Sequence, residues 1–266
     1  MFEIITHLLI IVLLLILFIL IWKINTKEGL INYLDGIDII YWINLDRSPE
    51  RRNNMEKMFQ DNIFIDISNE RFSAIDGNNP HTINKIEHRN PNEESNVYAC
   101  LLSHLESIRK FNNSNYDIAL ILEDDCTLDF KKYWKKSVKE IINNAPKDWE
   151  IIMLSYYFEG DSHILWDWSK MKNDYTDHET YSALSYIINK KGSNKLINEI
   201  YKNDKYTLKQ HLSPHADRYI FMSLKTYVYK YPMFIYKTEN DSTLGHNIQE
   251  HIQFKNHIIE EYSKIT

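Results

Sequence analysis

Short apolar runs alternate with segments of helical periodicity through most of the chain, and this alternation restricts the possible folds more than any other feature. The runs that read as strands are Ile39–Leu45, Arg71–Ile75, Asp117–Leu122, Glu150–Leu154 and Ser182–Ile188. The segments whose apolar spacing is helical are Ser48–Phe59, Tyr98–Phe111, Phe130–Asn143 and Gly192–Tyr201. Such an alternation predicts an α/β domain with a mainly parallel sheet flanked by helices.

The first part of the chain contains a long apolar run, Ile4–Trp22, about as long as a helix must be to cross a bilayer. It is too long for a cleaved signal peptide, and no small-residue cleavage site follows it. We therefore predict an N-terminal transmembrane helix that acts as a signal-anchor. The predicted organisation is an anchor with its flanks over residues 1–24, a linker over residues 25–38, and one folded domain over residues 39–266.

Two features of the sequence give opposite predictions for the side of the membrane on which the domain lies. Lys23 and Lys27 follow the run, and the positive-inside rule then favours a cytoplasmic domain. Two N-x-S/T sequons, at Asn112 and Asn240, would instead suit a lumenal domain. We expect a single-pass membrane protein and leave the side of the domain open.

Charge and cysteine content exclude some classes of protein. The formal net charge is −6 and the isoelectric point is about 6.0, whereas a nucleic-acid-binding protein needs clustered excess Lys and Arg. We therefore expect no nucleic-acid partner. The two cysteines, Cys100 and Cys126, lie beside apolar segments, and we interpret them as buried free thiols and not as a disulfide or a zinc site.

An acidic triplet, Glu123-Asp124-Asp125, directly follows the predicted strand Asp117–Leu122. Ligands of open α/β sheets bind beyond the carboxyl ends of the strands, so the triplet stands where a site is expected. Adjacent carboxylates repel one another, and a hard divalent ion such as Mn²⁺ or Mg²⁺ would compensate their charge. The alternative is a solvated turn, or a cap for the helix expected from Phe130.

Several separated segments together resemble glycosyltransferase family 25, which includes lipooligosaccharide and procollagen galactosyltransferases. In order they are INLDRSPERR (43–52), RFSAIDG (71–77), ACLLSHLESIRKF (99–111), ALILEDDCTL (119–128), WEIIMLS (149–155), TYSALSYIINKKGSNKLI (180–197) and PHADRYI (214–220). The resemblance extends from about Ile39 to Pro232. It is weakest over Gly160–Glu179 and after Pro232, where the acceptor would be chosen.

The resemblance implies a GT-A-type fold and transfer of a hexose, galactose or glucose, from a UDP-sugar with inversion at the anomeric carbon. It implies Mn²⁺ or Mg²⁺ as cofactor, a place in LPS or other glycan biosynthesis, and a lumenal domain by analogy. The partners would be a nucleotide-sugar donor, a glycan, lipid-linked saccharide or protein hydroxyl acceptor, and the membrane through the N-terminal helix.

Carried over to this sequence, the metal would be held by Glu123, Asp124 and Asp125, and would assist the departing nucleotide as a Lewis acid. The residues expected to bind the donor lie after the first strand and in the helix that precedes the triplet: Asn44, Asp46, Arg47, Arg52, Ser103 and His104. For Arg52 a solvated helix face is an alternative, and for His104 a structural role.

An inverting displacement needs a general base, and we predict Asp217 for this role. Its alternative role is that of a carboxylate at a helix N-terminus. Other carboxylates that could act as the base are Glu159, Asp161 and Asp241. Two histidines, His215 and His246, could add to the metal ligands or could lie on the surface.

Two other functions are compatible with the same residues. A metal-dependent phosphoesterase or phosphotransferase could use carboxylates at a strand end, although the chain has no G-x-x-x-x-G-K-[ST] loop. An inactive, membrane-tethered glycan-binding protein could keep the fold without turnover.

Overall fold

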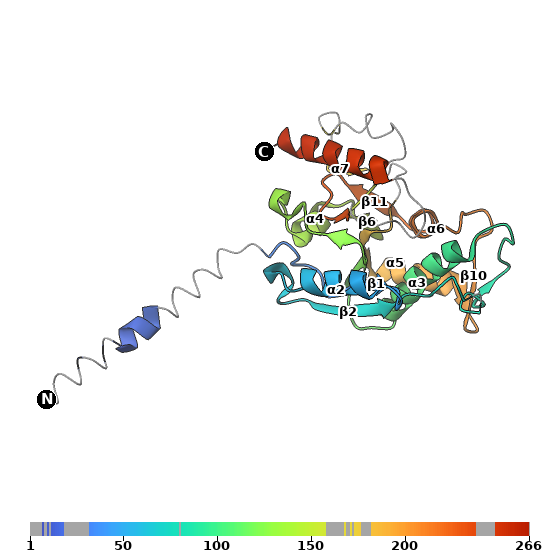
Figure 1. The fold of residues 1–266 in the computed structure, drawn as a ribbon, viewed down its shortest axis with the longest axis horizontal. Helices are drawn as coiled ribbons and strands as arrows, with labels where there is room; N and C mark the ends of the chain where they lie inside the picture. The colour runs from blue at the N-terminus through green and yellow to red at the C-terminus, as the bar shows by residue number, and fades with distance from the viewer. Residues whose placement is uncertain are drawn as a thin grey trace. The chain divides into compact units, whose positions relative to one another are not determined.

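The structure is a computed structural model, and it describes residues 7, 10, 12–18, 32–79, 81–157, 168, 171, 173–176, 182–237 and 248–265. The chain divides into two compact units, Met1–Tyr33 and Leu34–Thr266. The helices and strands below all belong to the second unit, and Figure 1 shows their order along the chain.

The predicted membrane-crossing helix, Ile4–Trp22, requires a correction. Much of it lies outside the described residues, and its described helical residues are His7, Ile10 and 12–18. None of the helices in the described part of the chain has the length and apolarity to cross a membrane, for which about 20 apolar residues are needed. The transmembrane helix in the predicted fold, the membrane tether and the single-pass localisation are therefore not supported. Residues 25–31 of the predicted linker also lie outside the described residues.

A seven-stranded sheet forms the centre of the second unit, in the order β2-β1-β4-β8-β6-β11-β7. Its strands are β1 (Ile39–Asn44), β2 (Ser68–Ser73), β4 (Ile118–Glu123), β6 (Ile151–Met153), β7 (Tyr175–Thr176), β8 (Ser185–Asn189) and β11 (Thr226–Tyr229). β1 runs parallel to β2 and β4, and β6 runs parallel to β11. β8 is antiparallel to both of its neighbours, β4 and β6, and β7 is antiparallel to β11. Most strands thus share one direction, and the predicted α/β class with a mainly parallel sheet, which fits a GT-A-type fold, is confirmed.

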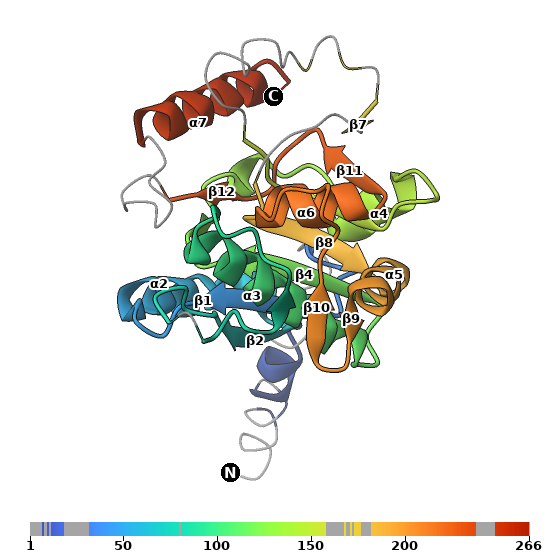
Figure 2. The same cartoon turned by 90° about the vertical axis from the view of Figure 1, so that its right-hand side faces the viewer.

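The central strands are apolar along their length because both faces of the sheet are covered. All six residues of β1 are buried, as are the four middle residues of β4. On one face, α3 (Ser95–Asn112) contacts α5 (Lys190–Ile200), α6 (Ala216–Ser223) and strands β1 and β2. Figure 2 shows these three helices in front of the sheet. α3 therefore lies directly against β1, the neighbour of the strand β4 that ends at the acidic triplet.

The segment after the triplet differs from its prediction. A helix was expected over Phe130–Asn143, but only a 3₁₀ turn at Lys131–Tyr133 and the helix α4 (Val138–Asn144) form. Ser137 starts α4 with a capping box, in which its hydroxyl accepts from the Glu140 N–H and the Glu140 carboxylate accepts from the Ser137 N–H. This box satisfies the first backbone donors of α4, so the helix begins there and not at Phe130.

The remaining elements lie around the sheet. They are α2 (Pro49–Met58), the strands β3 (Ile86–Glu87), β9 (Tyr201–Lys202) and β10 (Lys205–Thr207) of a small sheet, the paired strands β5 (Cys126–Thr127) and β12 (Ile235–Tyr236), and α7 (Ile248–Ser263). α7 is attached by aromatic contacts: Tyr262 stacks on Tyr133 with ring centroids 4.7 Å apart and meets Trp168 edge-on at 4.8 Å. The sequence analysis had assigned no helix to this segment.

The carboxyl ends of three parallel strands meet at one edge of the sheet. Ile43, near the end of β1, pairs with Phe72 of β2 on one side and with Glu123 of β4 on the other. The residues that follow these strands are therefore neighbours in space although they are far apart in sequence.

Candidate active site

Asp124 points into the protein from the end of β4. Its Oδ2 accepts a hydrogen bond of 2.6 Å from the Asn44 Nδ2, and its Oδ1 accepts one of 2.6 Å from the Arg51 Nη1. Burial raises the pKa of this carboxyl group above its ordinary value, although Arg51 and Asn44 oppose the shift. Both oxygens of Asp124 therefore have a protein partner, which holds the end of β4 against α2 and β1.

Asp125 has one oxygen without such a partner. Its Oδ2 lies 3.4 Å from the Arg51 Nη2, while its Oδ1 is buried and receives no hydrogen bond from any described residue. Burial, and next the charge of Glu123, raise the pKa of Asp125 to about 7 despite the nearby Arg51. A buried, unpaired carboxylate oxygen is costly unless a cation or a donor group reaches it.

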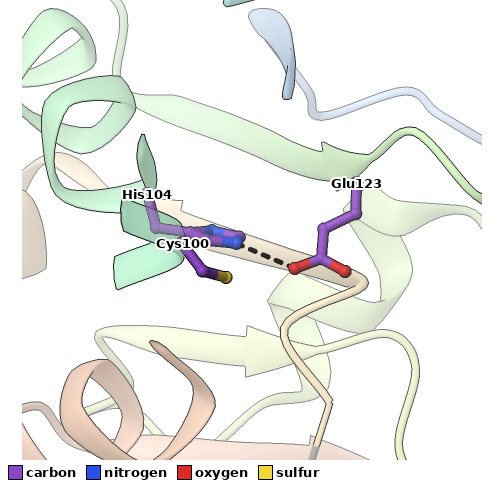
Figure 3. A group of neighbouring side chains, drawn as sticks. All are labelled: Cys100, His104 and Glu123. Carbon is purple, nitrogen blue, oxygen red and sulfur yellow. Dashed lines mark hydrogen bonds and ion pairs between the residues drawn. The ribbon is translucent and has the colours of Figure 1, made fainter. Parts of the chain in front are cut away.

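Glu123 is held by a histidine from α3. The His104 Nε2 lies 3.0 Å from the Glu123 Oε1, and the His104 Nδ1 lies 3.1 Å from the Tyr186 hydroxyl of β8. His104 is only 1 % exposed, so it lies beneath the site and not at its mouth. Figure 3 shows His104 and Cys100 side by side on α3, with Glu123 facing them from the end of β4.

The end of β1 is fixed by an arginine from β2. The Arg71 Nε donates to the Asn44 Oδ1 at 2.9 Å, and its Nη2 donates to the Asn44 carbonyl at 3.0 Å and to the Asp46 Oδ1 at 2.5 Å. Asp46 also accepts from the Ser73 hydroxyl at 2.8 Å, and these two hydrogen bonds lower its pKa. Asn44 is thereby oriented toward Asp124, while Asp46 is largely exposed.

The other residues predicted to bind the donor lie in three different environments. Arg47 is half-exposed and pairs with Asp76 at 2.9 Å. Arg52 is also half-exposed and pairs along the helix surface with Glu56 at 2.8 Å. Ser103 is buried in α3, where its hydroxyl accepts from the Ile75 N–H at 2.8 Å. Ser103 therefore attaches the loop after β2 to α3, and neither it nor Arg52 is hydrogen-bonded to the acidic triplet.

Asp217 lies in the first turn of α6 and contacts the segment before β8, which is in turn hydrogen-bonded to the end of β4. Its Oδ2 accepts a 3.0 Å hydrogen bond from the Ser182 N–H, and Ser182 has a positive φ of 107°. Two residues later, the Leu184 carbonyl accepts from the Glu123 N–H at 2.9 Å. The pKa of the Cys100 thiol is raised by its burial and by the charges of Glu123, Asp217 and Asp125, which gather at this edge.

The remaining predicted residues are not part of this arrangement as far as the structure describes them. His215 lies at the exposed start of α6, and its Nδ1 is 2.9 Å from the Ser213 hydroxyl. Glu159, Asp161, Asp241 and His246 lie outside the described residues.

The structure adds four residues that the sequence analysis did not select: Arg51, Arg71, Cys100 and Tyr186. A signal for Arg51 was present, because Arg51 and the buried Met55 are four residues apart on α2 and so share the inner face of that helix. Arg52, one position later, faces solvent. The contacts of Arg71 and Tyr186 join distant segments, and no local pattern marks them. Cys100 lies four residues before His104 on the same helix.

The comparisons with known proteins identify the family. A family model described as glycosyltransferase family 25 (LPS biosynthesis protein) matches residues 37–213. The chain belongs to glycosyltransferase family 25. The predicted family is thereby confirmed. The matched range contains the ends of β1, β2 and β4 together with α3, which carry most of the site.

The relatives are longer proteins. A glycosyltransferase 25 family member of Aedes aegypti is 30% identical over 202 residues, which are 66% of this chain and 32% of the relative. One of Drosophila melanogaster is 31% identical over 122 residues, which are 41% of this chain and 19% of the relative. The chain thus matches a third or less of the length of these relatives. The solved structure of the glycosyltransferase GlyE of Streptococcus pneumoniae TIGR4 aligns with a TM-score of 0.41 and 8% identity over 86% of this chain and 64% of that one, and a score at this level supports no argument.

Proposed function

We propose that this family 25 chain is a metal-dependent, inverting glycosyltransferase that moves a hexose from a UDP-sugar to a hydroxyl group of a glycan, a lipid-linked saccharide or a protein. The observation that carries the proposal is the Oδ1 atom of Asp125, which is buried without a hydrogen-bond partner among the described residues, at the edge where the ends of β1, β2 and β4 meet. The family supports the donor and the inversion, and the geometry supports a cation.

The charges at this edge fit a divalent cation. Three carboxylates, Glu123, Asp124 and Asp125, are accompanied by one guanidinium, that of Arg51, which leaves two negative charges. In the proposal, Asp125 and Glu123 supply oxygen ligands to Mn²⁺ or Mg²⁺, for which carboxylates are suitable donors. Asp124, whose oxygens are engaged by Asn44 and Arg51, keeps its two neighbours in position. The bound ion would stabilise negative charge on the leaving diphosphate.

The exposed residues beyond β1 are proposed to meet the nucleotide. Asp46 and Arg47 have side chains that are 74% and 45% exposed, so both can reach a ligand above the strand ends. Arg47 can pair with a phosphate oxygen, as arginine does at many phosphate sites. His104, Ser103 and Asn44 are buried, and their proposed part is to position Glu123, the loop after β2, and Asp124.

Asp217 remains the proposed general base for the acceptor hydroxyl. The Ser182 N–H donates to the Asp217 Oδ2 and holds this carboxyl group in place in the first turn of α6. The variant Asp217→Asn keeps an oxygen that can accept from Ser182 and loses only the basic group. Removal of a general base lowers turnover by about 100- to 10,000-fold, and UDP release by this variant should fall within that range while its fold persists.

The test measures UDP release by the purified full-length chain from UDP-galactose and UDP-glucose, with Mn²⁺, with Mg²⁺ and with a chelator. Asp125→Asn removes one ligand charge at nearly unchanged size, and we expect UDP release to fall by about 100-fold or more. Asp129→Asn is the matched control: Asp129 is an exposed carboxylate of the same region that pairs with Lys255, and its loss should leave the rate unchanged.

The outcomes separate the possible functions. UDP release that ignores the chelator, or that persists in Asp125→Asn, would refute the metal-dependent transfer. Inorganic phosphate released from phosphoesters would identify a phosphoesterase instead. Saturable binding of glycans without turnover of any donor would identify a glycan-binding protein.

A further inference from the structure

The inner side of the site contains three side chains with different ligand atoms. Cys100 and His104 are four residues apart on α3 and so lie on one face of the helix, and Glu123 faces them from the end of β4 (Figure 3). One ligand atom from each, a sulfur, an imidazole nitrogen and a carboxylate oxygen, all lie within 4.8 Å of one another. We call these three residues the Cys-His-Glu cluster.

The spacing of the ligand atoms is close to what a metal ion needs. At the usual distances of zinc to sulfur, nitrogen and oxygen, two ligand atoms of a tetrahedral site are about 3.3 to 3.8 Å apart. The His104 Nε2 and the Glu123 Oε1 are 3.0 Å apart, slightly less than that separation. The widest separation in the cluster, at most 4.8 Å, would close with a movement of about 1 Å or a change of the Cys100 rotamer.

The chemistry of the donor atoms selects the type of ion. A thiolate and an imidazole together suit Zn²⁺ or Co²⁺, whereas Mg²⁺ and Mn²⁺ prefer sites made of oxygen. Binding would release the Cys100 thiol proton to solvent as the sulfur–metal bond forms, and the ring proton of His104 would reside on Nδ1. Two further carboxylates, Asp124 and Asp125, follow Glu123 in sequence and add negative charge beside the cluster.

An outer partner that would orient the histidine is also in place. The Tyr186 hydroxyl lies 3.1 Å from the His104 Nδ1, and the two rings are stacked with centroids 5.9 Å apart. A hydroxyl can accept the Nδ1–H and leave Nε2 to face the ion, as metal-binding histidines generally require of their second nitrogen. Tyr186 is fully buried in β8, so this partner has a fixed position.

We propose that the Cys-His-Glu cluster is a binding site for a thiophilic divalent cation, of which Zn²⁺ is the natural example. This site differs from the oxygen-rich site proposed at Asp125 because it has sulfur and nitrogen ligands. The two sites have one residue in common, Glu123. Cation binding by the cluster does not depend on the identity of the donor sugar or on sugar transfer. The sequence analysis had interpreted Cys100 as a buried free thiol, because it lies beside an apolar segment.

The experiment uses Co²⁺ as a spectroscopic probe in the purified full-length chain. A thiolate bound to Co²⁺ gives a charge-transfer absorption band in the near ultraviolet, and carboxylate or imidazole ligands do not. The chain has only two cysteines, so the source of the band can be assigned by substitution. We expect the band in wild type and in the matched control Cys126→Ser, and we expect Cys100→Ser to lack it. Zn²⁺ should displace the Co²⁺ and abolish the band.

One more variant and one alternative measurement complete the test. Tyr186→Phe removes only the hydroxyl that faces His104, and should weaken Zn²⁺ binding by about 10- to 100-fold, as loss of an outer partner does at other metal sites. If Cys100→Ser fails to fold by circular dichroism, Zn²⁺ protection of Cys100 from alkylation in the Cys126→Ser background replaces it.

The proposal has clear contrary outcomes. Absence of the band in wild type, its persistence in Cys100→Ser, or unchanged alkylation of Cys100 with Zn²⁺ would overturn it. None of these measurements requires a nucleotide-sugar, so the cluster can hold a metal while the proposed transfer fails, or the reverse.

Discussion

The substitution Asp125→Asn is expected to remove the pH dependence of stability that arises from this residue in the metal-free protein. Burial and the charge of Glu123 raise the pKa of Asp125 from 3.8 to about 7 in the folded state. The folded protein therefore binds a proton between these pH values that the unfolded chain has lost. For an acid whose folded pKa is raised, stability is present at low pH and falls as the pH rises toward the folded pKa.

The size of the effect follows from the two pKa values. One pKa unit corresponds to about 1.36 kcal/mol, so the ionised Asp125 opposes folding by roughly 4 kcal/mol above pH 7. Between about pH 5 and pH 7 the loss is roughly 3 kcal/mol. The Asp125 side chain is 24% exposed, so water screens this charge only in part. The neutral amide of Asp125→Asn should not lose this stability, and the variant should be more stable than wild type at about pH 8.

Urea unfolding of the full-length chain, followed by the fluorescence of its six tryptophans, measures the effect. The free energy of unfolding is compared for wild type, Asp125→Asn and the exposed control Asp129→Asn, at about pH 5 and pH 8 in a chelator. Added Mn²⁺ should then narrow the difference at the higher pH, since a ligand at 100 times its dissociation constant adds about 2.7 kcal/mol to wild type. If wild type and Asp125→Asn show parallel stability at both pH values, the assignment of a raised pKa to Asp125 is refuted.

Two further predictions concern stability. Arg51→Ala leaves two carboxylates of the triplet without their cation and should lower the free energy of unfolding by about 3 kcal/mol. The neighbouring Arg52→Ala removes only an exposed ion pair and should change it by less than about 1 kcal/mol, and equal effects in urea unfolding would contradict the difference. Ser103→Ala removes the acceptor of the Ile75 N–H and should destabilise by about 1 to 3 kcal/mol. Ser107→Ala, which loses a hydroxyl that donates to a carbonyl of the same helix, is the matched control, and a loss as large as that of Ser103→Ala would argue against the loop attachment.

The sequence predicted these strands well because the pattern that marks a strand is local. An apolar run bounded by polar residues is formed by consecutive residues and can be recognised without knowledge of tertiary contacts. β1 and β4 were expected as Ile39–Leu45 and Asp117–Leu122; β1 differs from the observed strand by one residue at its end, and β4 by one residue at each end. The direction of β8 was not predictable in this way. A strand that is buried on both faces has the same apolar pattern whether it runs parallel or antiparallel to its neighbours.

The helix expected over Phe130–Asn143 shows a second limit of local patterns. Its apolar spacing was adequate, but Phe130 is fully buried against Tyr262 of α7, with ring centroids 5.5 Å apart. The start of the segment is therefore engaged in packing on a helix more than 100 residues away, and the helix begins only at the Ser137 cap. Contacts of this kind outweigh the small differences in helix propensity.

The sequence by itself determined at which edge of the sheet the acidic triplet would lie. An acidic triplet that follows an apolar strand must emerge at the carboxyl edge of the sheet, since strand direction and burial leave it no other position. The tertiary structure alone decided what each carboxylate does. Asp124 is engaged by Arg51 and Asn44, Asp125 keeps a buried oxygen without a described partner, and Glu123 faces His104 and Cys100 of α3. These differences arise from long-range packing of α2 and α3 against β4, and three adjacent acidic residues cannot reveal them.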